Sequence, residues 1–364
     1  MVKPATPRTL EMRQDRVPGL VSVIIGAYNS GKDIGQTIDS LLAQTCPQVE
    51  VIVVDDGSTD HTWEVLSRYG DRIVAVKQAN GGVAAARNTG LRQARGEFIA
   101  LMDHDDLCMP ERLAVQVAVL RQWPDVGLCG SEFGAFNQQG RLAERYSAHY
   151  YGQCDAAHGG AAAHYAQHTW LDISTCLPPG QAATGEVTRT PVFLGEVYDD
   201  IACGNFVHPP TVMFRAHLID QVGAFDADAR LSCDWDWLVR AARVTRFAHV
   251  DHPLLDYRRS NTQISSDRFS PRISLDVLHV TERIVARDPG LWQRKGATLM
   301  HLLGGLYVDA AYANAEIAPF LALGLVLKAW WSYRAFTGMS LRVLIRALAP
   351  RFVLDVMRRH RQPA

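Results

Sequence analysis

The first third of the chain alternates uninterrupted apolar runs with segments of helical spacing. The apolar runs lie at residues 21–25, 49–54, 72–77 and 97–102. Between them, apolar residues recur at helical spacing, as at Ile34, Ile38 and Leu41, or alanine is abundant, as at 82–94. Such runs are typical of strands buried on both faces of a parallel sheet. The pattern therefore predicts an α/β fold whose sheet is doubly wound and mostly parallel, with helices on both faces.

Polar residues follow several of these predicted strands at their carboxyl ends, where such sheets bind ligands. Tyr28 follows the first run, Asp55 and Asp56 end the second, and residues 103–106 end the fourth. Taken alone, Asp55 and Asp56 are better explained as part of a turn and helix cap, and Tyr28 as ordinary loop chemistry. Their convergence on one sheet edge favours a binding site.

The stretch Asp-His-Asp-Asp at 103–106 carries the strongest chemical signal in the chain. Carboxylates crowded at the end of a strand repel one another, and a nearby cation offsets that cost. A hard divalent ion takes oxygen ligands and leaves coordination positions open for phosphate oxygens. The stretch therefore predicts a divalent-cation site with coordination positions open for phosphate oxygens.

Beyond Gly130 the alternation of strand and helix stops. Residues 141–202 show little period of either kind, which predicts a binding loop, a lid or disorder. The histidines and cysteines scattered through this segment match no standard zinc spacing, so a loop with incidental histidines is the better interpretation. Residues 205–215 then predict a strand, and residues 232–240 predict a helix that begins with acidic residues.

The last part of the chain is basic. Residues 328–364 contain eight Lys or Arg and a single acidic residue, Asp355. One face of a predicted helix gathers Leu341, Leu344, Ile345 and Leu348, with Arg342 and Arg346 away from it. A basic amphipathic helix suits an anionic membrane surface. A helix packed on the rest of the protein with a solvated cationic face fits equally well, and both interpretations stay open.

Composition narrows the class of protein. The chain has 364 residues, of which 48% are apolar, so it can build a large core and two domains. Its net charge of −1 gives no reason to expect a nucleic-acid partner. Seven scattered cysteines fit a reducing cytoplasm. Residues 1–19 lack a signal peptide's apolar core, and the apolar run 317–327 is too short to span a bilayer. We expect a cytoplasmic protein, soluble or peripheral on the inner face of the cell membrane.

These segments together resemble the family 2 glycosyltransferases of the GT-A fold. The matching segments are 21–29, 51–60, 80–90, 96–110 and 205–265, a highly specific combination. The resemblance implies a catalytic domain at 20–270, with a donor half at 20–130 and an acceptor half at 131–270. A tail at 1–19 would precede it, and a helical, basic region at 271–364 would follow it.

The resemblance also assigns roles to individual residues. The donor-binding residues implied are Ala27, Tyr28, Asp56, Arg87 and Asp103. Tyr28 would lie along the nucleotide base, Asp56 would accept a hydrogen bond from the base imide, and Arg87 would face the diphosphate. Asp103 would lie near the ribose or the metal, and Asp105 would be the main protein ligand of the divalent cation. On a helix, Arg87 is otherwise more often solvated or ion-paired.

The acidic segment at 232–240 resembles the family's motif below the acceptor site. The position that matches the catalytic base is Asp234, since a carboxylate can take the proton of an attacking hydroxyl. The same residue also suits a helix N-terminus, and Asp236 is expected to be structural. The family usually has Glu where this chain has Cys233. Near 257–265, a closing motif carries Ser260 where the family commonly has His.

The expected function is inverting transfer of a sugar from a nucleotide-diphosphate donor, favouring a UDP- or TDP-sugar. A saccharide or lipid-linked acceptor in surface polysaccharide or glycolipid synthesis would suit the basic tail. One alternative is a sugar nucleotidyltransferase, which would carry a more basic, Gly-rich loop than residues 26–32. Another is a non-catalytic nucleotide-sugar-binding module of the same fold. A dinucleotide oxidoreductase is disfavoured, because no Gly-x-Gly-x-x-Gly follows the first strand.

Overall fold

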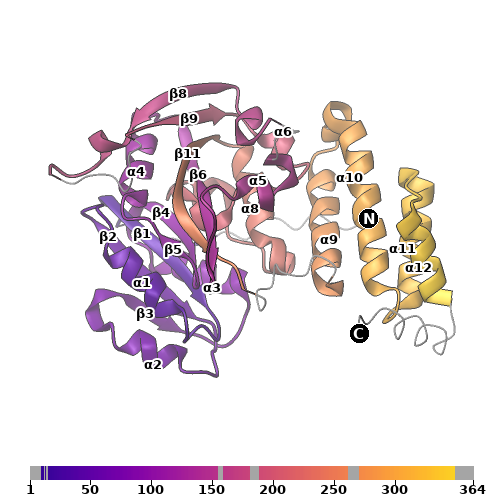
Figure 1. The fold of residues 1–364 in the computed structure, drawn as a ribbon, viewed down its shortest axis with the longest axis horizontal. Coiled ribbons are helices and arrows are strands. Elements are labelled where there is room, and N and C mark those ends of the chain that lie inside the picture. Colours follow the sequence, from indigo (N-terminus) through magenta and orange to yellow (C-terminus); the bar gives the residue numbers. More distant parts are fainter. Residues whose placement is uncertain are drawn as a thin grey trace. The chain divides into compact units, whose positions relative to one another are not determined.

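The computed structural model describes residues 10–11, 13, 15–154, 159–180, 188–260 and 270–348. The chain divides into two compact units (Figure 1). Described residues up to Ser260 form the first unit, and those from Ser270 onward form the second.

The first unit is built on one mixed sheet with the strand order β3-β2-β1-β4-β10-β6-β11-β9-β8. Its first half is parallel and contains β1 (Val17–Ala27), β2 (Val49–Asp55), β3 (Val74–Lys77) and β4 (Gly96–Asp103). The second half mixes directions and contains β6 (Val126–Asn137), β8 (Gln167–Asp172), β9 (Arg189–Gly195), β10 (Met213–Arg215) and β11 (Arg246–Arg258). Two short strands extend it, β5 (Leu107–Cys108) on β11 and β7 (Gly140–Ala143) on β6.

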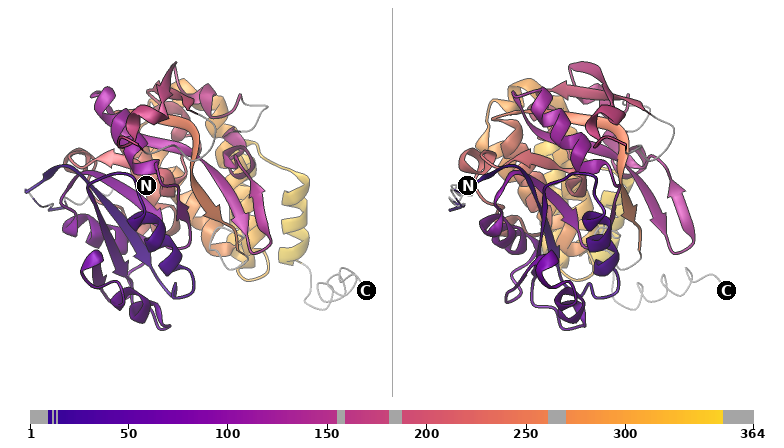
Figure 2. Two further views of the ribbon diagram at one scale, coloured as in Figure 1. Left: turned by 60° about the vertical axis from the view of Figure 1, so that its left-hand side comes forward. Right: turned by 90° about the vertical axis from the view of Figure 1, so that its left-hand side faces the viewer.

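Helices lie on both faces of this sheet (Figure 2). Val21, Val23 and Ile25 of β1 share one apolar cluster with α1 (Ile34–Leu42) and α4 (Arg112–Gln122). On the other face lie α3 (Val83–Gln93) and α8 (Cys233–Ala242), whose Trp237 ring packs 4.6 Å from Phe214 of β10. Shorter helices are α2 (Thr62–Ser67), α5 (Ser147–Tyr150), α6 (Tyr198–Ile201) and α7 (Leu218–Val222). The predicted fold class, an α/β sheet with helices on both faces, is confirmed.

The α3 helix approaches β1 closely because its facing residue is a glycine. A Cβ atom at Gly90 would lie 2.4 Å from Cγ2 of Ile24, so any larger residue would push the helix away. This contact sets the height of α3 above the sheet, and with it the position of Arg87 one turn earlier on the same helix.

The register of the parallel strands aligns the residues that carry the predicted site. Ala27 at the end of β1 pairs with Asp55 at the end of β2, and Gly26 pairs with Asp103 at the end of β4. Because these three strands are neighbours, their carboxyl ends form one continuous edge. Tyr28, Asp56 and the acidic stretch therefore extend from the same side of the sheet.

Several predicted boundaries differ from the structure. β1 begins at Val17, where its backbone N–H donates to the carbonyl of Arg95, so the last residues of the predicted 1–19 tail are strand. The strand predicted at 205–215 is wrong except for Met213–Arg215. Pro209 and Pro210 supply no backbone N–H and instead begin a 3₁₀ turn at Pro209–Thr211.

The segment 141–202 is more regular than its sequence predicts. β8 and β9 lie within it and pair antiparallel, and β9 joins the sheet through β11. Burial alternates along β9: Thr190, Val192 and Leu194 are buried, whereas Arg189 is exposed. The expectation of a lid or disorder is therefore wrong for these strands, because a short strand needs only a few alternating residues.

The second unit is helical. It consists of α9 (Pro271–Arg287), α10 (Leu291–Asn314), α11 (Pro319–Tyr333) and α12 (Gly338–Leu348). A small core cluster joins Ala311 of α10 and Ala315, the residue after that helix, to Ala322 and Val326 of α11 and to Val343 of α12. Of the helices in the described residues, none has both the length and the apolarity needed to cross a membrane.

Candidate functional site

Arg87 is the centre of the candidate site because its guanidinium reaches carboxylates from both halves of the sheet. It lies on α3 and is only 5% exposed. Its Nη2 atom lies 3.4 Å from Oδ1 of Asp103, which ends β4. Its Nη1 atom lies 3.6 Å from Oδ2 of Asp234, in the first turn of α8. The proposed donor side and the proposed base therefore share one buried cation.

Burial and neighbouring charges shift the protonation equilibria of this triad. Desolvation raises the pKa of Asp234, and the Arg87 charge opposes that rise. Desolvation also raises the pKa of Asp103, where Arg87 opposes the rise and Asp105 adds to it. For Arg87, desolvation lowers the pKa, but Cys233, Asp234 and Asp103 together raise it above its ordinary value. The guanidinium thus stays charged and partly compensates the charges of both acids.

The first turn of α8 contains one partly exposed carboxylate and one fully buried carboxylate. The Asp234 side chain is 23% exposed, and its Oδ1 accepts a hydrogen bond of 2.7 Å from the backbone N–H of Trp235. Asp236 is fully buried and pairs with Arg240 at 2.9 Å, which fits its expected structural role. Trp237, Leu238 and Ala241 form the buried side of the helix, as predicted.

Cys233 occupies the position where the resemblance leads one to expect a third carboxylate. Its Sγ lies 3.8 Å from Nη1 of Arg87, and the residue is fully buried. A thiol is a weak acceptor compared with a carboxylate. Arg87 is therefore directed more strongly towards Asp103 and Asp234 than it would be beside Glu.

Asp56 holds the loop that leads into α3. Its Oδ1 accepts hydrogen bonds from Nε2 of Gln78 at 2.7 Å and from the backbone N–H of Gly81 at 2.9 Å. Its Oδ2 accepts from the backbone N–H of Gly82 at 2.7 Å. Asp56 is only 4% exposed. To accept a hydrogen bond from the imide of a nucleotide base, as the resemblance implies, it would have to use an oxygen that already accepts from this loop.

Ala27 and Tyr28 lie where the first strand meets the site edge. Ala27 is buried, and its carbonyl accepts a hydrogen bond of 2.8 Å from the backbone N–H of Asp56. Tyr28 is 48% exposed, which leaves its ring accessible to an aromatic ligand. Asp55 serves the turn instead: its Oδ1 accepts from the backbone N–H of Ser58, and Gly57 has a φ of 77°. The turn interpretation of residues 55–58 therefore holds for Asp55.

The acidic turn after β4 is held by Arg258, a residue that the sequence analysis left without a role. Nε of Arg258 donates to the backbone carbonyl of Asp105 at 2.7 Å, and its backbone N–H donates to Oδ1 of Asp106 at 2.9 Å. Asp106 is fully buried, and desolvation followed by the charges of Asp105 and Asp103 raises its pKa well above the ordinary value. Arg258 ends β11, and β11 pairs with β5 directly after the acidic stretch. That pairing, which the sequence alone does not show, is what brings Arg258 to the turn.

These carboxylates suit a divalent cation that is shared with a ligand. Asp103 and Asp105 offer oxygen donors, and their mutual repulsion is a cost that a cation would relieve. Nowhere in the described residues do three His, Cys, Asp or Glu side chains form a group that could hold a metal by themselves. The protein therefore fits a cation whose remaining ligands come from elsewhere, such as phosphate or water.

A cluster of aromatic rings lies near Asp234 and was also missed from the sequence. The His208 ring stacks on Phe133 at 4.0 Å, and its Nδ1 lies 3.2 Å from the hydroxyl of Tyr151. Burial, with a smaller effect of the Asp234 charge, raises the pKa of Tyr151 well above its ordinary value. Burial lowers the pKa of His208 to about 3. Tyr151 lies within the segment whose sequence showed no period, so no pattern marked it.

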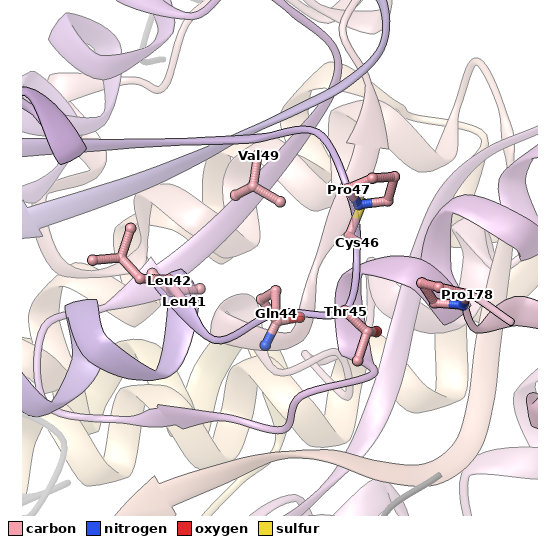
Figure 3. Close-up of a pocket in the computed structure, with 8 residues that line it drawn as sticks. All are labelled: Leu41, Leu42, Gln44, Thr45, Cys46, Pro47, Val49 and Pro178. Carbon is pink, nitrogen blue, oxygen red and sulfur yellow. The ribbon is translucent and has the colours of Figure 1, made fainter. Parts of the chain in front are cut away.

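A separate pocket of about 440 Å³ lies at the amino end of β2, away from the candidate site (Figure 3). It is lined by residues that precede or begin β2, including Cys46, Pro47 and Val49. Since β2 runs from Val49 to Asp55, this pocket is at the amino end of the strand and Asp56 is at the other. None of the residues predicted for the site lines it.

Comparison with known proteins relates this chain to glycosyltransferases. The model for glycosyl transferase family 2 matches residues 22–171. An uncharacterized glycosyltransferase of Rickettsia prowazekii is 27% identical over 247 residues, which are 67% of this chain and 65% of that protein. The Escherichia coli UDP-Glc:alpha-D-GlcNAc-diphosphoundecaprenol beta-1,3-glucosyltransferase WfaP is 41% identical over 100 residues, 27% of this chain and 40% of WfaP. The chain thus spans less than two thirds of the length of these relatives.

Two solved structures share the fold. Residues 1–349 of TarS from S. aureus, in complex with UDP-GlcNAc, match with a TM-score of 0.52 and 17% identity over 86% of this chain and 90% of that one. The mannosyltransferase PcManGT from Pyrobaculum calidifontis, in complex with GDP-Man and Mn²⁺, matches with a TM-score of 0.52 and 20% identity over 94% and 90%. The family model and the sequence relatives supply the classification that the fold leaves open: residues 22–171 carry a glycosyl transferase family 2 domain.

Proposed function

We propose that this protein is an inverting glycosyltransferase that moves a sugar from a nucleotide-diphosphate donor to an acceptor hydroxyl. The observation that carries the proposal is the bridge from Arg87 to Asp103 and Asp234. It couples the carboxyl end of β4, where a donor would bind, to a carboxylate that suits a base. Direct displacement at the anomeric carbon needs one such base and no covalent enzyme intermediate.

The donor is proposed to lie along the edge formed by β1, β2 and β4. Ala27 and Tyr28 would contact the nucleotide base, Asp56 would accept from its imide, and Arg87 would face the diphosphate. Support for a nucleotide-diphosphate sugar comes from UDP-GlcNAc in TarS, GDP-Man in PcManGT and the UDP-Glc named for WfaP. Two of these three carry UDP, so we propose a UDP- or TDP-sugar.

Asp105, with Asp103 beside it, is proposed to hold a divalent cation, Mn²⁺ or Mg²⁺. When bound, such a cation neutralises negative charge on a departing diphosphate. The chain's own part is to hold the acidic turn in place, through the bonds from Arg258 to the Asp105 carbonyl and the Asp106 carboxylate. PcManGT contains Mn²⁺, which supports the choice of metal to test first.

Asp234 is proposed to take the proton of the acceptor hydroxyl as it attacks. Its first-turn position on α8 and its partly exposed side chain suit contact with an acceptor. The WfaP name specifies a lipid-linked acceptor, which supports a saccharide or lipid-linked acceptor in surface polysaccharide or glycolipid synthesis here. Peripheral attachment to the inner face of the cell membrane would follow from such an acceptor, and the basic tail after Lys328 supports it.

The direct test is a donor screen that follows nucleotide release. Release should require Mn²⁺ or Mg²⁺, should be fastest with a UDP- or TDP-sugar, and should rise when a lipid-linked saccharide is added. A chelator should stop it. Release of pyrophosphate from a nucleoside triphosphate and a sugar phosphate would instead support a nucleotidyltransferase. Tight donor binding without any turnover would support the non-catalytic alternative.

The pH dependence of transfer should report the raised pKa of Asp234. Only the ionised carboxylate accepts a proton, so kcat/KM should fall as the pH drops through the pKa of this group. Because desolvation raises that pKa above its ordinary value of 3.8, the loss should begin at a higher pH than for an exposed aspartate. A profile of kcat/KM against pH checks this, and a flat profile down to pH 4 would contradict it.

A further inference from the structure

The α11 helix buries mostly small residues and exposes several of its large apolar residues. Its buried positions are Ala322, Val326 and Ala329, of which Ala322 and Val326 join the core cluster of the second unit. Its exposed positions include Phe320 at 88%, Leu327 at 58% and Trp331 at 87%. Helices of soluble domains normally bury their large apolar residues and expose polar ones. The outward face of α11 therefore has the apolar character of an interaction surface.

The exposed residues form a continuous stripe. Phe320, Gly324, Leu327 and Trp331 follow one another at helical spacing, and all four are exposed. Trp330 lies beside this stripe and packs against Phe336, with ring centroids 6.0 Å apart and about half of each residue exposed. An apolar surface of this kind marks an interaction site.

The α12 helix also exposes a row of apolar residues. Leu341, Ile345 and Leu348 recur at helical spacing and are exposed, whereas Val343 is buried in the core of the unit. Leu344, expected on the same apolar face, is half-buried and packs against that core. The predicted amphipathic face is thus divided between an inward and an outward set.

Every charged residue within the segment that carries this surface is positive. Residues 317–348 contain Lys328, Arg334, Arg342 and Arg346 and no acidic residue. Lys328 pairs with Glu282 at 3.0 Å, and Arg346 lies 3.9 Å from Glu316. Arg334 and Arg342 are exposed and make no ion pair within the described part of the chain. Two cations are therefore left to meet an anionic partner.

We propose that the outward face of α11, extended by α12, docks on an anionic lipid surface. With 15 residues, α11 suits a helix that lies in the membrane interface with one face in the acyl boundary. Trp330 and Trp331 supply rings with an apolar body and a polar N–H, which favour that boundary. Arg334 and Arg342 would meet lipid phosphates.

Charge also favours a membrane over a second copy of the chain. A symmetric pair of α11 faces would bring the cations of one copy towards those of the other, with no acid in residues 317–348 to offset them. An anionic lipid surface offsets them directly. The inference extends the proposed membrane attachment, because it places the contact on α11 rather than on the tail after residue 338 alone.

The test is flotation of the full chain with vesicles of phosphatidylglycerol and phosphatidylcholine, compared with phosphatidylcholine alone. Phe320→Glu and Trp331→Glu should each lower partitioning into vesicles by at least about tenfold. Each puts a charge in place of a large apolar side chain that the membrane would bury. Trp170→Glu is the matched control: Trp170 is 54% exposed on β8, and its change should leave partitioning as in wild type. Salt should weaken the binding.

Other results would contradict the proposal that this face docks on anionic lipid. A wild-type chain that ignores anionic vesicles, or a Trp331→Glu variant that binds them as well as wild type does, contradicts it. Light scattering that shows a wild-type dimer, made monomeric by Trp331→Glu with no change in vesicle binding, assigns the face to a second copy. Nucleotide release measured without vesicles reports on the proposed function separately: it should persist in Trp331→Glu, whereas its absence from wild type would overturn the enzyme and leave the surface standing.

Discussion

Replacing Asp234 with Asn should lower the rate of sugar transfer by about 10²–10⁴-fold, the range expected for loss of a general base. The amide has nearly the same shape as the carboxylate but cannot take the proton of an attacking hydroxyl. Donor affinity should change little, because the base acts on the acceptor. Steady-state transfer and direct titration of the donor, measured on the same preparation, separate these two effects.

The matched control for this variant is Asp228→Asn. Asp228 lies in the exposed turn just before α8, and its side chain has no partner in the described residues. The control should transfer at the wild-type rate. If Asp234→Asn also kept the wild-type rate, the base would have to be another group.

Loss of the Asp234 charge should have a second, structural effect through Arg87. The guanidinium is nearly buried, so removing one partner leaves it with Asp103 and the Cys233 thiol. Leaving a buried charge with fewer partners lowers stability. Circular dichroism at the assay temperature must therefore show a folded protein before a lost rate is assigned to chemistry.

The sheet edge that carries the site is predictable from the sequence for a physical reason. β1, β2 and β4 are covered on both faces, so each gives an apolar run that stops where the site begins. The strand ends at Ala27, Asp55 and Asp103 therefore coincide with the change from apolar to polar residues. Helical spacing likewise predicts α1 and α3 to within a few residues.

The sequence does not show which distant residues meet. Arg87 and Asp234 belong to segments far apart in the chain, and their contact depends on how α8 crosses the sheet. Arg258 holds the acidic turn through a backbone carbonyl, a partner that no motif specifies. Thr37 adds to the same turn by donating to the carbonyl of Asp106 at 2.8 Å. Such contacts follow from tertiary packing, which local patterns do not encode.

The outward face of α11 is a third case. Its sequence is apolar on nearly every side, so helical period alone cannot tell which side is buried. Only the burial of Ala322, Val326 and Ala329 shows that several of the larger residues point outward. The sequence analysis placed its membrane expectation on the 341–348 face, and one residue of that face, Leu344, proved to be half-buried against the core.

Replacing Asp105 with Ala should abolish metal-dependent donor binding and turnover while the fold survives. The turn should keep its shape because Arg258 holds the backbone carbonyl of Asp105 and the carboxylate of Asp106. A cation on a diphosphate is worth several kcal/mol, so donor affinity in Mn²⁺ should fall by at least about a hundredfold. Calorimetric titration of the donor with and without Mn²⁺ measures this loss.

His104→Ala is the matched control, since His104 lies in the same turn and contributes its backbone carbonyl, not its side chain, to the bond from Thr37. It should bind Mn²⁺ and donor as wild type does. An Asp105→Asn variant refines the test, because it keeps one oxygen ligand and removes the charge. If charge neutralisation at the diphosphate is the main contribution, Asn should be nearly as impaired as Ala. Full activity of Asp105→Ala in the presence of a chelator would remove both the ligand assignment and the metal from the proposed reaction.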